Sequence, residues 1–106
     1  MELNRENFPK LFKAFEKYLI RVSNVESKIF ESLDLSKLVN TGLLQYGSSV
    51  YFFDEVDIIV SVWNPGQGWK WRVSDIRNVT IEGYGKSRKE CEQAAIKEAC
   101  TRFEKI

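Results

Sequence analysis

The residue types that perform most enzyme chemistry are scarce in this chain. It contains no histidine, which excludes Ser-His-Asp and Cys-His nucleophile systems and histidine metal sites. The densest carboxylate group is Asp54, Glu55 and Asp57, a residue set that could hold a magnesium ion. A strand period of two separates Asp54 from Glu55 onto opposite faces, and no nucleophile or general base accompanies them. We interpret these acids as a solvated strand end and expect no metal, no cofactor and no enzymatic activity.

The segment Gly85-Lys86-Ser87 lies between a predicted strand and a predicted helix, like the end of a phosphate-binding P-loop. The full motif requires a glycine where this chain has Thr80, and a parallel sheet that so short a chain cannot build. Both points argue against nucleotide hydrolysis. The free N–H groups of the helix start, with Lys86, Arg88 and Lys89 beside them, still favour an anion. A simple helix cap with solvated basic side chains is the alternative.

The two cysteines, Cys91 and Cys100, lie nine positions apart on one predicted helix. Their separation is about 13 Å along the helix axis, which is too far for a disulfide. We expect two reduced thiols in the core.

The elements that would position these residues are clearest from Trp69 to Ile106. Apolar and basic side chains alternate over residues 69–73, which predicts a strand with Trp69, Trp71 and Val73 facing inward and Lys70 and Arg72 outward. Residues 74–78 are polar enough to form a turn. Residues 79–82 alternate again, with Val79 and Ile81 inward, so the two strands should pair antiparallel.

A capping box, Ser87-Arg88-Lys89-Glu90, predicts a long helix that begins at Arg88. The Ser87 hydroxyl would accept from the N–H of Glu90, and the Glu90 carboxylate from the N–H of Ser87. The helix has an apolar stripe that we expect to pack on the sheet, formed by Cys91, Ala95, Ile96, Ala99, Cys100, Phe103 and Ile106. Its opposite face is polar, with Glu90, Gln93, Lys97, Thr101 and Glu104.

A first helix should begin at Phe8-Pro9, with Asn7 as its cap. Its apolar face consists of Phe8, Leu11, Phe12, Phe15, Leu19 and Val22. From Ser23 to Thr41 the pattern is weaker. Val25, Ile29 and Leu33 suit a second short helix, and Asp34 could cap a helical turn through Leu35, Leu38 and Val39 that Gly42 ends. A strand over residues 25–30 is the alternative.

The middle of the chain predicts a hairpin and a further strand. Leu43–Tyr46 and Val50–Phe53 flank Gly47-Ser48-Ser49, which suggests the hairpin. The next strand covers residues 56–63, with an inner face of Val56, Ile58, Val60 and Val62. The turn Asn64-Pro65-Gly66-Gln67-Gly68, with Gly66 at positive φ, connects it to the Trp69 strand.

These elements predict one α+β domain over residues 1–106. It has one or more N-terminal helices, an antiparallel β-meander of three or more strands and a long C-terminal helix packed on the sheet. A chain of 106 residues can bury a core without disulfides or metals. The N-terminal residues carry no apolar signal segment and no run could span a bilayer, so we expect a cytoplasmic protein without membrane contact.

Charge is balanced at +1 overall but unevenly distributed. Residues 26–57 contain six acids and two bases, whereas residues 70–89 contain six bases and two acids. A nucleic-acid binder with a strong electrostatic footprint would usually be more basic than this chain.

The segment Gly83-Tyr84-Gly85-Lys86-Ser87-Arg88-Lys89-Glu90-Cys91-Glu92-Gln93-Ala94-Ala95 resembles the closing motif of double-stranded RNA-binding domains. The resemblance covers about residues 58–103. It implies a helix on a three-stranded antiparallel sheet, with Arg88 and Lys89 as phosphate contacts and Lys86 nearby. Glu92 stands where that family has a third lysine.

The chain is also similar to small phage and plasmid proteins that carry a Trp-x-Trp-x-Val strand followed by a Ser-Arg-x-Glu helix start. This resemblance implies a small cytoplasmic accessory protein, several members of the group acting by binding and blocking a host machine.

Two functions follow. The first is a non-enzymatic protein-binding module, such as an inhibitor from a mobile element that acts on a host protein complex. Its anchor would be a tryptophan on the outer sheet face flanked by Lys70, Arg72 and Tyr84. Trp63, which shares a strand face with Ile59 and Asp57, is as readily exposed as buried, whereas Trp69 and Trp71 are expected in the core.

The second function is RNA or DNA binding through basic side chains, with Tyr84 available to stack on bases; the cations are Lys70, Arg72, Lys86, Arg88 and Lys89. An edge strand of the small sheet could also pair with a second copy of the chain, so a homodimer is an open alternative.

Overall fold

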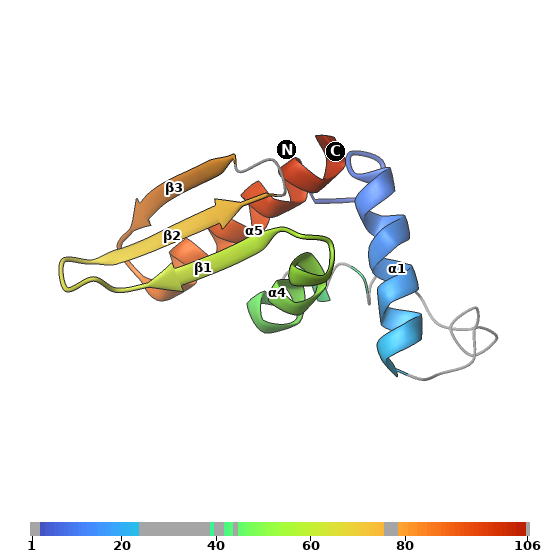
Figure 1. Ribbon diagram of the computed structural model, residues 1–106, viewed down its shortest axis with the longest axis horizontal. Helices are drawn as coiled ribbons and strands as arrows, with labels where there is room; N and C mark the ends of the chain where they lie inside the picture. The colour runs from blue at the N-terminus through green and yellow to red at the C-terminus, as the bar shows by residue number, and fades with distance from the viewer. Residues whose placement is uncertain (1–2, 24–38, 40–41, 44, 76–78, 106) are drawn as a thin grey trace.

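The protein is described by a computed structural model that covers residues 3–23, 39, 42–43, 45–75 and 79–105. The elements in chain order are α1 (Pro9–Ser23), α4 (Tyr46–Glu55), β1 (Ile59–Trp63), β2 (Trp69–Ser74), β3 (Thr80–Gly85) and α5 (Arg88–Lys105). This is the α+β architecture expected from the sequence, with helices first, then a meander and a long final helix (Figure 1). None of the described helices is long and apolar enough to cross a membrane.

The sheet is a three-stranded antiparallel meander in the order β1-β2-β3. β1 pairs with β2 from Ile59 opposite Ser74 to Trp63 opposite Lys70, and β2 pairs with β3 from Trp69 opposite Gly85 to Ser74 opposite Thr80. The alternation predicted for residues 69–73 is confirmed for Val73, which is buried, and Arg72, which is exposed. Trp69 and Trp71, which were expected in the core, are half-buried, as is Lys70. Gly66 has the expected positive φ of 107°, and Gly68 shares that value.

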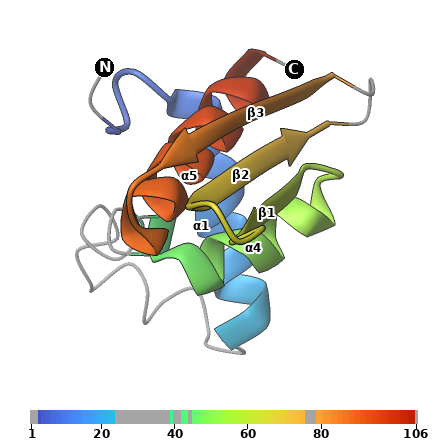
Figure 2. The same cartoon turned by 90° about the vertical axis from the view of Figure 1, so that its left-hand side faces the viewer.

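Helix α5 packs against all three strands on one face of the sheet (Figure 2). Its expected apolar stripe is buried over Cys91, Ala95, Ile96, Ala99, Cys100 and Phe103, while Ile106 lies outside the described residues. Both cysteines are buried free thiols, as expected. Burial raises the pKa of Cys100 to about 12, so this thiol stays protonated and unreactive at neutral pH.

The start of α5 is capped largely as predicted. The Ser87 hydroxyl accepts from the N–H of Glu90 at 3.2 Å, but the Glu90 carboxylate accepts from the N–H of Lys86 at 3.3 Å, one residue before the expected donor. Two glycines of β3 leave room for side chains of the neighbouring elements β2 and α5. A Cβ at Gly83 would lie 2.4 Å from Trp71 Nε1, and one at Gly85 would lie 2.7 Å from Cys91 Sγ.

Helix α1 begins at Pro9 as predicted, and Phe8, Leu11, Phe12 and Phe15 are buried. Val22 was expected on the same face but is 56% exposed. The helix begins one residue later than a cap at Asn7 requires. The carboxylate of Glu104 accepts from the N–H groups of Lys10 at 3.3 Å and Leu11 at 3.0 Å, so α5 caps α1.

The hairpin predicted around Gly47-Ser48-Ser49 is wrong, because these residues lie inside helix α4. The helix buries Phe52 and Phe53, whose ring centroids lie 5.1 Å apart, and Phe52 also meets Phe15 edge to face at 4.9 Å. The buried Ser49 hydroxyl donates to carbonyl oxygens of Gly42 and Leu43. Burial of the two aromatic rings therefore outweighs the turn preference of the Gly-Ser-Ser segment.

Two strand boundaries also differ from the prediction. Val56 was expected on the inner face of a strand but forms the end of α4, and β1 begins at Ile59. Val79 was expected inward but precedes β3 and is 38% exposed. The second helix predicted over residues 25–33 and the cap at Asp34 lie outside the described residues. The expectation that Gly42 ends a helical turn is wrong, because Gly42 and Leu43 are themselves helical.

Candidate binding surface on the outer face of the sheet

The outer face of the sheet, turned away from α5, gathers four of the candidate residues in two cross-strand rows. In the first row Lys70 of β2 lies between Trp63 of β1 and Tyr84 of β3. In the second row Arg72 lies between Ser61 and Glu82. These residues meet because antiparallel pairing with a period of two brings alternate positions of three strands onto one face.

The first row is an aromatic pair with a cation between the rings. The Lys70 ammonium lies 5.6 Å from the ring centroid of Trp63 and 5.3 Å from that of Tyr84. Both distances fit a cation–π contact. Tyr84 is 76% exposed, so its ring projects from the face while the Lys70 stem is largely covered.

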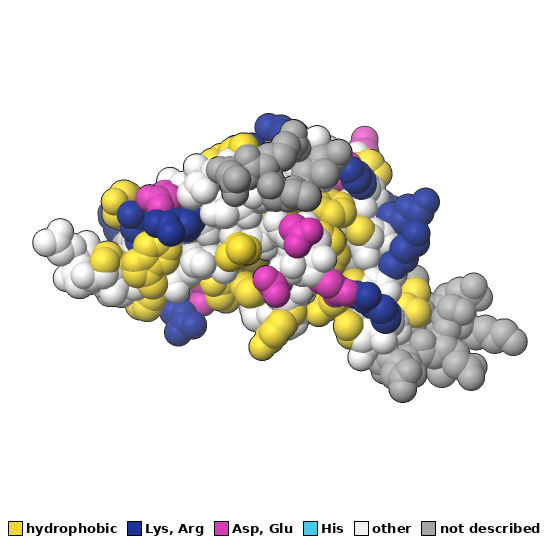
Figure 3. Space-filling model, viewed as in Figure 1, with side chains coloured by type: hydrophobic (Ala, Val, Ile, Leu, Met, Phe, Trp, Pro, Cys, Tyr) yellow, Lys and Arg dark blue, Asp and Glu magenta, His cyan; other side chains and the backbone are white. Residues whose placement is uncertain are grey.

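The second row contains Glu82, whose carboxylate neutralises the cations of both rows. The Glu82 carboxylate pairs with Lys70 at 3.1 Å and with Arg72 at 2.6 Å, and the Arg72 guanidinium lies 5.3 Å from the Trp63 ring centroid. Hydrogen bonds from Lys70 and then from Arg72 lower the pKa of Glu82, and the same carboxylate raises the pKa of Lys70. Trp63, Lys70, Arg72, Glu82 and Tyr84 thus form one connected network, which we call the aromatic-cation cluster (left side of Figure 3).

The other three candidates, Lys86, Arg88 and Lys89, lie around the start of α5. Arg88 is paired with Glu92 at 2.9 Å and its guanidinium lies 6.0 Å from the ring centroid of Trp69. Lys86 and Lys89 are exposed and form no ion pair with any described residue. Because β3 runs directly into α5, these residues and Tyr84 occupy the same end of the molecule (Figure 1).

A cleft of about 700 Å³ lies between the start of α4 and the start of α5. It is lined by Gln45, Tyr46, Gly47, Arg88, Lys89, Glu92 and Gln93. Burial, followed by the charge of Glu92, raises the pKa of Tyr46, so its hydroxyl is protonated at neutral pH.

The carboxylates first considered for a metal are placed differently from the expectation. Asp54 and Glu55 lie in the last turn of α4, not at a strand end, and Asp57 follows with a positive φ of 63°. Within the described parts of the chain, no three histidine, cysteine, aspartate or glutamate side chains converge as a metal site would require.

No family model, curated protein or solved structure matches this chain. The similarities to double-stranded RNA-binding domains and to small phage proteins therefore stay predictions. The described residues instead define a candidate binding surface on the outer face of the sheet.

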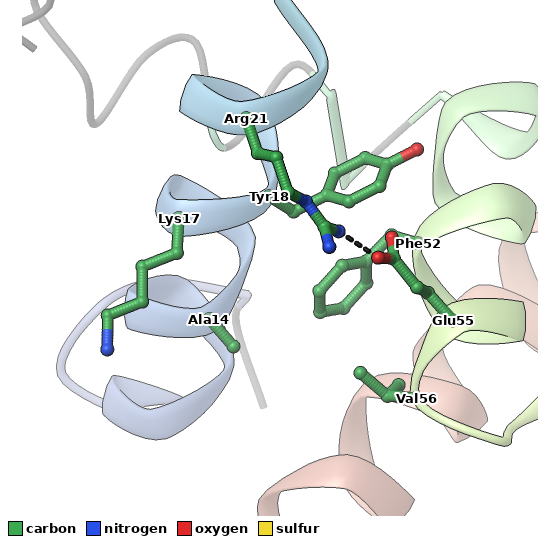
Figure 4. Close-up of a pocket in the computed structure, with 7 residues that line it drawn as sticks. All are labelled: Ala14, Lys17, Tyr18, Arg21, Phe52, Glu55 and Val56. Atoms are coloured by element: carbon green, nitrogen blue, oxygen red, sulfur yellow. Dashed lines mark ion pairs between the residues drawn. The ribbon is translucent and has the colours of Figure 1, made fainter.

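The sequence patterns missed two parts of the surface. Glu82 was not a candidate, although its alternation with Tyr84 and its place opposite Arg72 in an antiparallel pair would have indicated it. The second omission is a groove of about 380 Å³ between α1 and α4 (Figure 4), lined by Ala14, Lys17, Tyr18, Arg21, Phe52, Glu55 and Val56. The groove requires residues 46–55 to form the helix α4, so the hairpin predicted over residues 43–53 gave no indication of it.

Proposed function

We propose that this protein is a non-enzymatic binding module that recognises a protein partner through the aromatic-cation cluster. The observation that carries the proposal is the row of Trp63, Lys70 and Tyr84 on the sheet face turned away from α5, in which Tyr84 is 76% exposed and the other two side chains are half-buried. Tryptophan, tyrosine and arginine are the residues most enriched among those that dominate protein–protein binding energy. All three types occur within this cluster.

The contacts within the cluster favour a protein over a nucleic acid. Both cations are bound to Glu82, and both lie over the Trp63 ring, so ring faces and positive charges are already engaged within the chain. A phosphate would meet the Glu82 carboxylate, and a base would have to displace Lys70 or Arg72 to stack on the tryptophan. A protein partner can instead contact the fixed ring edges and the projecting Tyr84 without breaking these pairs.

The arrangement is suited to binding because it is held in place before the partner arrives. Ion pairs and cation–π contacts restrict Trp63, Lys70 and Arg72, so little side-chain entropy is lost on association. We propose that the partner is a host protein complex and that the bound module blocks it, as the similarity to small phage and plasmid proteins implies.

The test is capture of partners from a lysate of the organism that carries the gene, using the whole chain as bait. We expect a stoichiometric protein with the native chain, and its loss with Trp63→Ala combined with Tyr84→Ala. Tyr51→Ala is the matched control, because Tyr51 is similarly exposed at 73% but lies on α4. Recovery of no stoichiometric protein, or equal loss in the control, would reject the proposal.

RNA or DNA binding is the alternative function, through Lys86, Arg88 and Lys89 together with Lys70, Arg72 and Tyr84. Its specific support is that Lys86 and Lys89 have no ion-pair partner among the described residues. A gel shift at low salt with duplex RNA, duplex DNA and single strands decides it. Binding should weaken by about 0.7 to 0.9 log units per log unit of salt for each phosphate contacted.

A further inference from the structure

The α1–α4 groove separates two flanks of opposite charge. On the α1 side are Lys10, Lys13, Lys17 and Arg21, and on the α4 side are Asp54, Glu55 and Asp57; we call these sets the basic flank and the acidic flank. Figure 3 shows Lys and Arg side chains along α1 and Asp and Glu side chains over α4 on the same face of the molecule.

The basic flank is a single stripe along α1. Spacings of three, four and four residues place its cations on one side of the helix over a length of about 16 Å. The only acid of α1, Glu16, lies about 100° around the helix and pairs with Arg5. Lys13 and Lys17 are exposed and pair with no described carboxylate, and Figure 4 shows Lys17 extending away from Glu55.

The acidic flank is placed where it weakens its own helix. Asp54 and Glu55 lie in the last turn of α4, where the helix dipole disfavours negative charge, and that turn contains no basic residue. Glu55 is relieved by an ion pair with Arg21 across the groove (Figure 4). Asp54 and Asp57 are exposed and have no ion-pair partner among the described residues.

Between the flanks the floor of the groove is apolar. It consists of Ala14, Tyr18, Phe52 and Val56, and the Arg21 guanidinium lies 5.8 Å from the Tyr18 ring centroid. Exposed Tyr51 lies beside the acidic flank, because positions 51, 54 and 55 share one face of α4. The surface therefore has an apolar centre with opposite charges on its two sides.

Such a surface is complementary to itself. A two-fold axis that lies in the interface and runs along the groove exchanges its two sides, so the basic flank of one copy faces the acidic flank of the other. We infer that the α1–α4 groove is the interface of a homodimer, whose occupant is a second copy of this chain. Lys13 and Lys17 of one copy then pair with Asp54 and Asp57 of its partner, and the apolar floors meet between them.

This interface differs from the edge-strand pairing considered from the sequence, since it leaves β1 and β3 unpaired by the second copy. It is also independent of the proposed function, because the aromatic-cation cluster belongs to other elements. The small net charge of +1 imposes little general repulsion between copies.

The test is sedimentation velocity of the whole chain from about 1 µM to 1 mM at low salt, a range that covers the dimers expected from a groove of this kind. We expect a dimer whose dissociation constant rises with added salt. Lys13→Glu with Lys17→Glu, or Asp54→Lys with Asp57→Asn, should each raise that constant by about 100-fold or more, because like charges then face each other. Asn is chosen at position 57 because it tolerates the positive φ found there.

The decisive arm is a mixture of the two variants. In the mixed pair the glutamates introduced at positions 13 and 17 face the lysine introduced at position 54, and the two unaltered flanks face each other, so a heterodimer should form although neither variant dimerises alone. The control is Lys86→Glu with Lys89→Glu, which makes the same charge change at the α5 start and should leave the dimer intact. All substituted side chains are exposed, and circular dichroism checks that each variant folds.

Three results would overturn the inference. One is a native chain that stays monomeric over the whole range. Another is a dimer that survives both flank variants, as an edge-strand dimer would. The third is a mixture of folded flank variants that stays monomeric.

Discussion

The outer face of the sheet and the α1–α4 groove use the same residue types in opposite ways. In the aromatic-cation cluster, one carboxylate holds both cations and two rings within a few ångströms, so the charges are satisfied inside the chain. Across the groove Arg21 pairs with Glu55, and Lys10 lies over the ring of Phe103. The other flank charges have no ion-pair partner among the described residues. The first surface is complete before anything binds to it. For the second surface, we propose that a second copy of the chain supplies the opposite charges.

Because of this difference, a small domain can bind two different partners through two separate surfaces. A closed network presents shape and ring edges and exerts little long-range attraction, so its partner is selected by fit. The separated basic and acidic flanks create an asymmetric electrostatic field. This field favours binding of a surface on which the two charges have the opposite arrangement. A second copy of the chain is the one molecule certain to have that pattern.

Removal of Trp63 should have the largest effect on binding of the protein partner. Trp63→Ala should weaken binding of the protein partner by about 30-fold or more, because central tryptophans typically contribute about 2 kcal/mol or more to an interface. Isothermal titration calorimetry with the recovered partner measures this. The variant should dimerise like the native chain, and a parallel loss of dimerisation would merge the two surfaces into one.

A backbone test on the opposite face of the sheet comes next. Gly83→Ala places a methyl group 2.4 Å from Trp71 Nε1, so we expect a loss of about 1 to 3 kcal/mol in the free energy of unfolding. Gly47→Ala is the matched control: nothing lies within 4 Å of its Cβ and it sits within α4, so it should be neutral or stabilising by up to about 1 kcal/mol. Urea unfolding compares the two, and equal effects would contradict the packing described for Trp71.

Because Glu104 of α5 caps the start of α1, a substitution at this residue should destabilise α1 and the α1–α4 groove without destabilising the sheet. Glu104→Gln should cost roughly 1 to 2 kcal/mol in the free energy of unfolding, because the N–H groups of Lys10 and Leu11 lose a charged acceptor. Hydrogen exchange should increase in the first turn of α1 and remain unchanged in β2 and β3. An increase spread evenly over the sheet would show that α1 is not anchored locally.

The smallest effect concerns the pH dependence of Glu82. Its pKa is lowered in the folded state by Lys70 and Arg72, so its contribution to stability is fully present above the unfolded pKa of about 4.3 and is lost as the pH falls through the lower folded pKa. The stability difference between the native chain and Glu82→Gln should therefore shrink as the pH falls from about 4.3 through the folded pKa. A difference that stays constant down to pH 2 would mean that the carboxylate is not held by the two cations.

The sheet and its surface were predictable because they depend on short-range alternation. A period of two in Trp69–Val73 and the pairing of neighbouring strands are enough to place Lys70, Arg72 and Tyr84 on one face. The capping box likewise fixes the start of α5 through a local contact, in which the Ser87 hydroxyl accepts from the N–H of Glu90. For these residues local sequence and tertiary structure agree.

The groove was not predictable, because α4 depends on contacts from distant segments. Gly47-Ser48-Ser49 has the composition of a turn, but the helix buries Phe52 and Phe53, and the Phe52 ring packs against rings of α1 and α5. Asp54 and Glu55 then move from an expected strand end to a helix end. The stripe of cations on α1 could have been noted from its spacing, but its significance requires the acidic flank beside it.

Native mass spectrometry of the complex recovered from the host tests the central claim, that one chain carries two independent surfaces. We expect two copies of this chain with two partner molecules. With Trp63→Ala the two copies should remain without partners, and with Lys13→Glu combined with Lys17→Glu one copy should remain with one partner. If either change removes both the partner and the second copy from a folded chain, the two surfaces are not separate and the account is wrong.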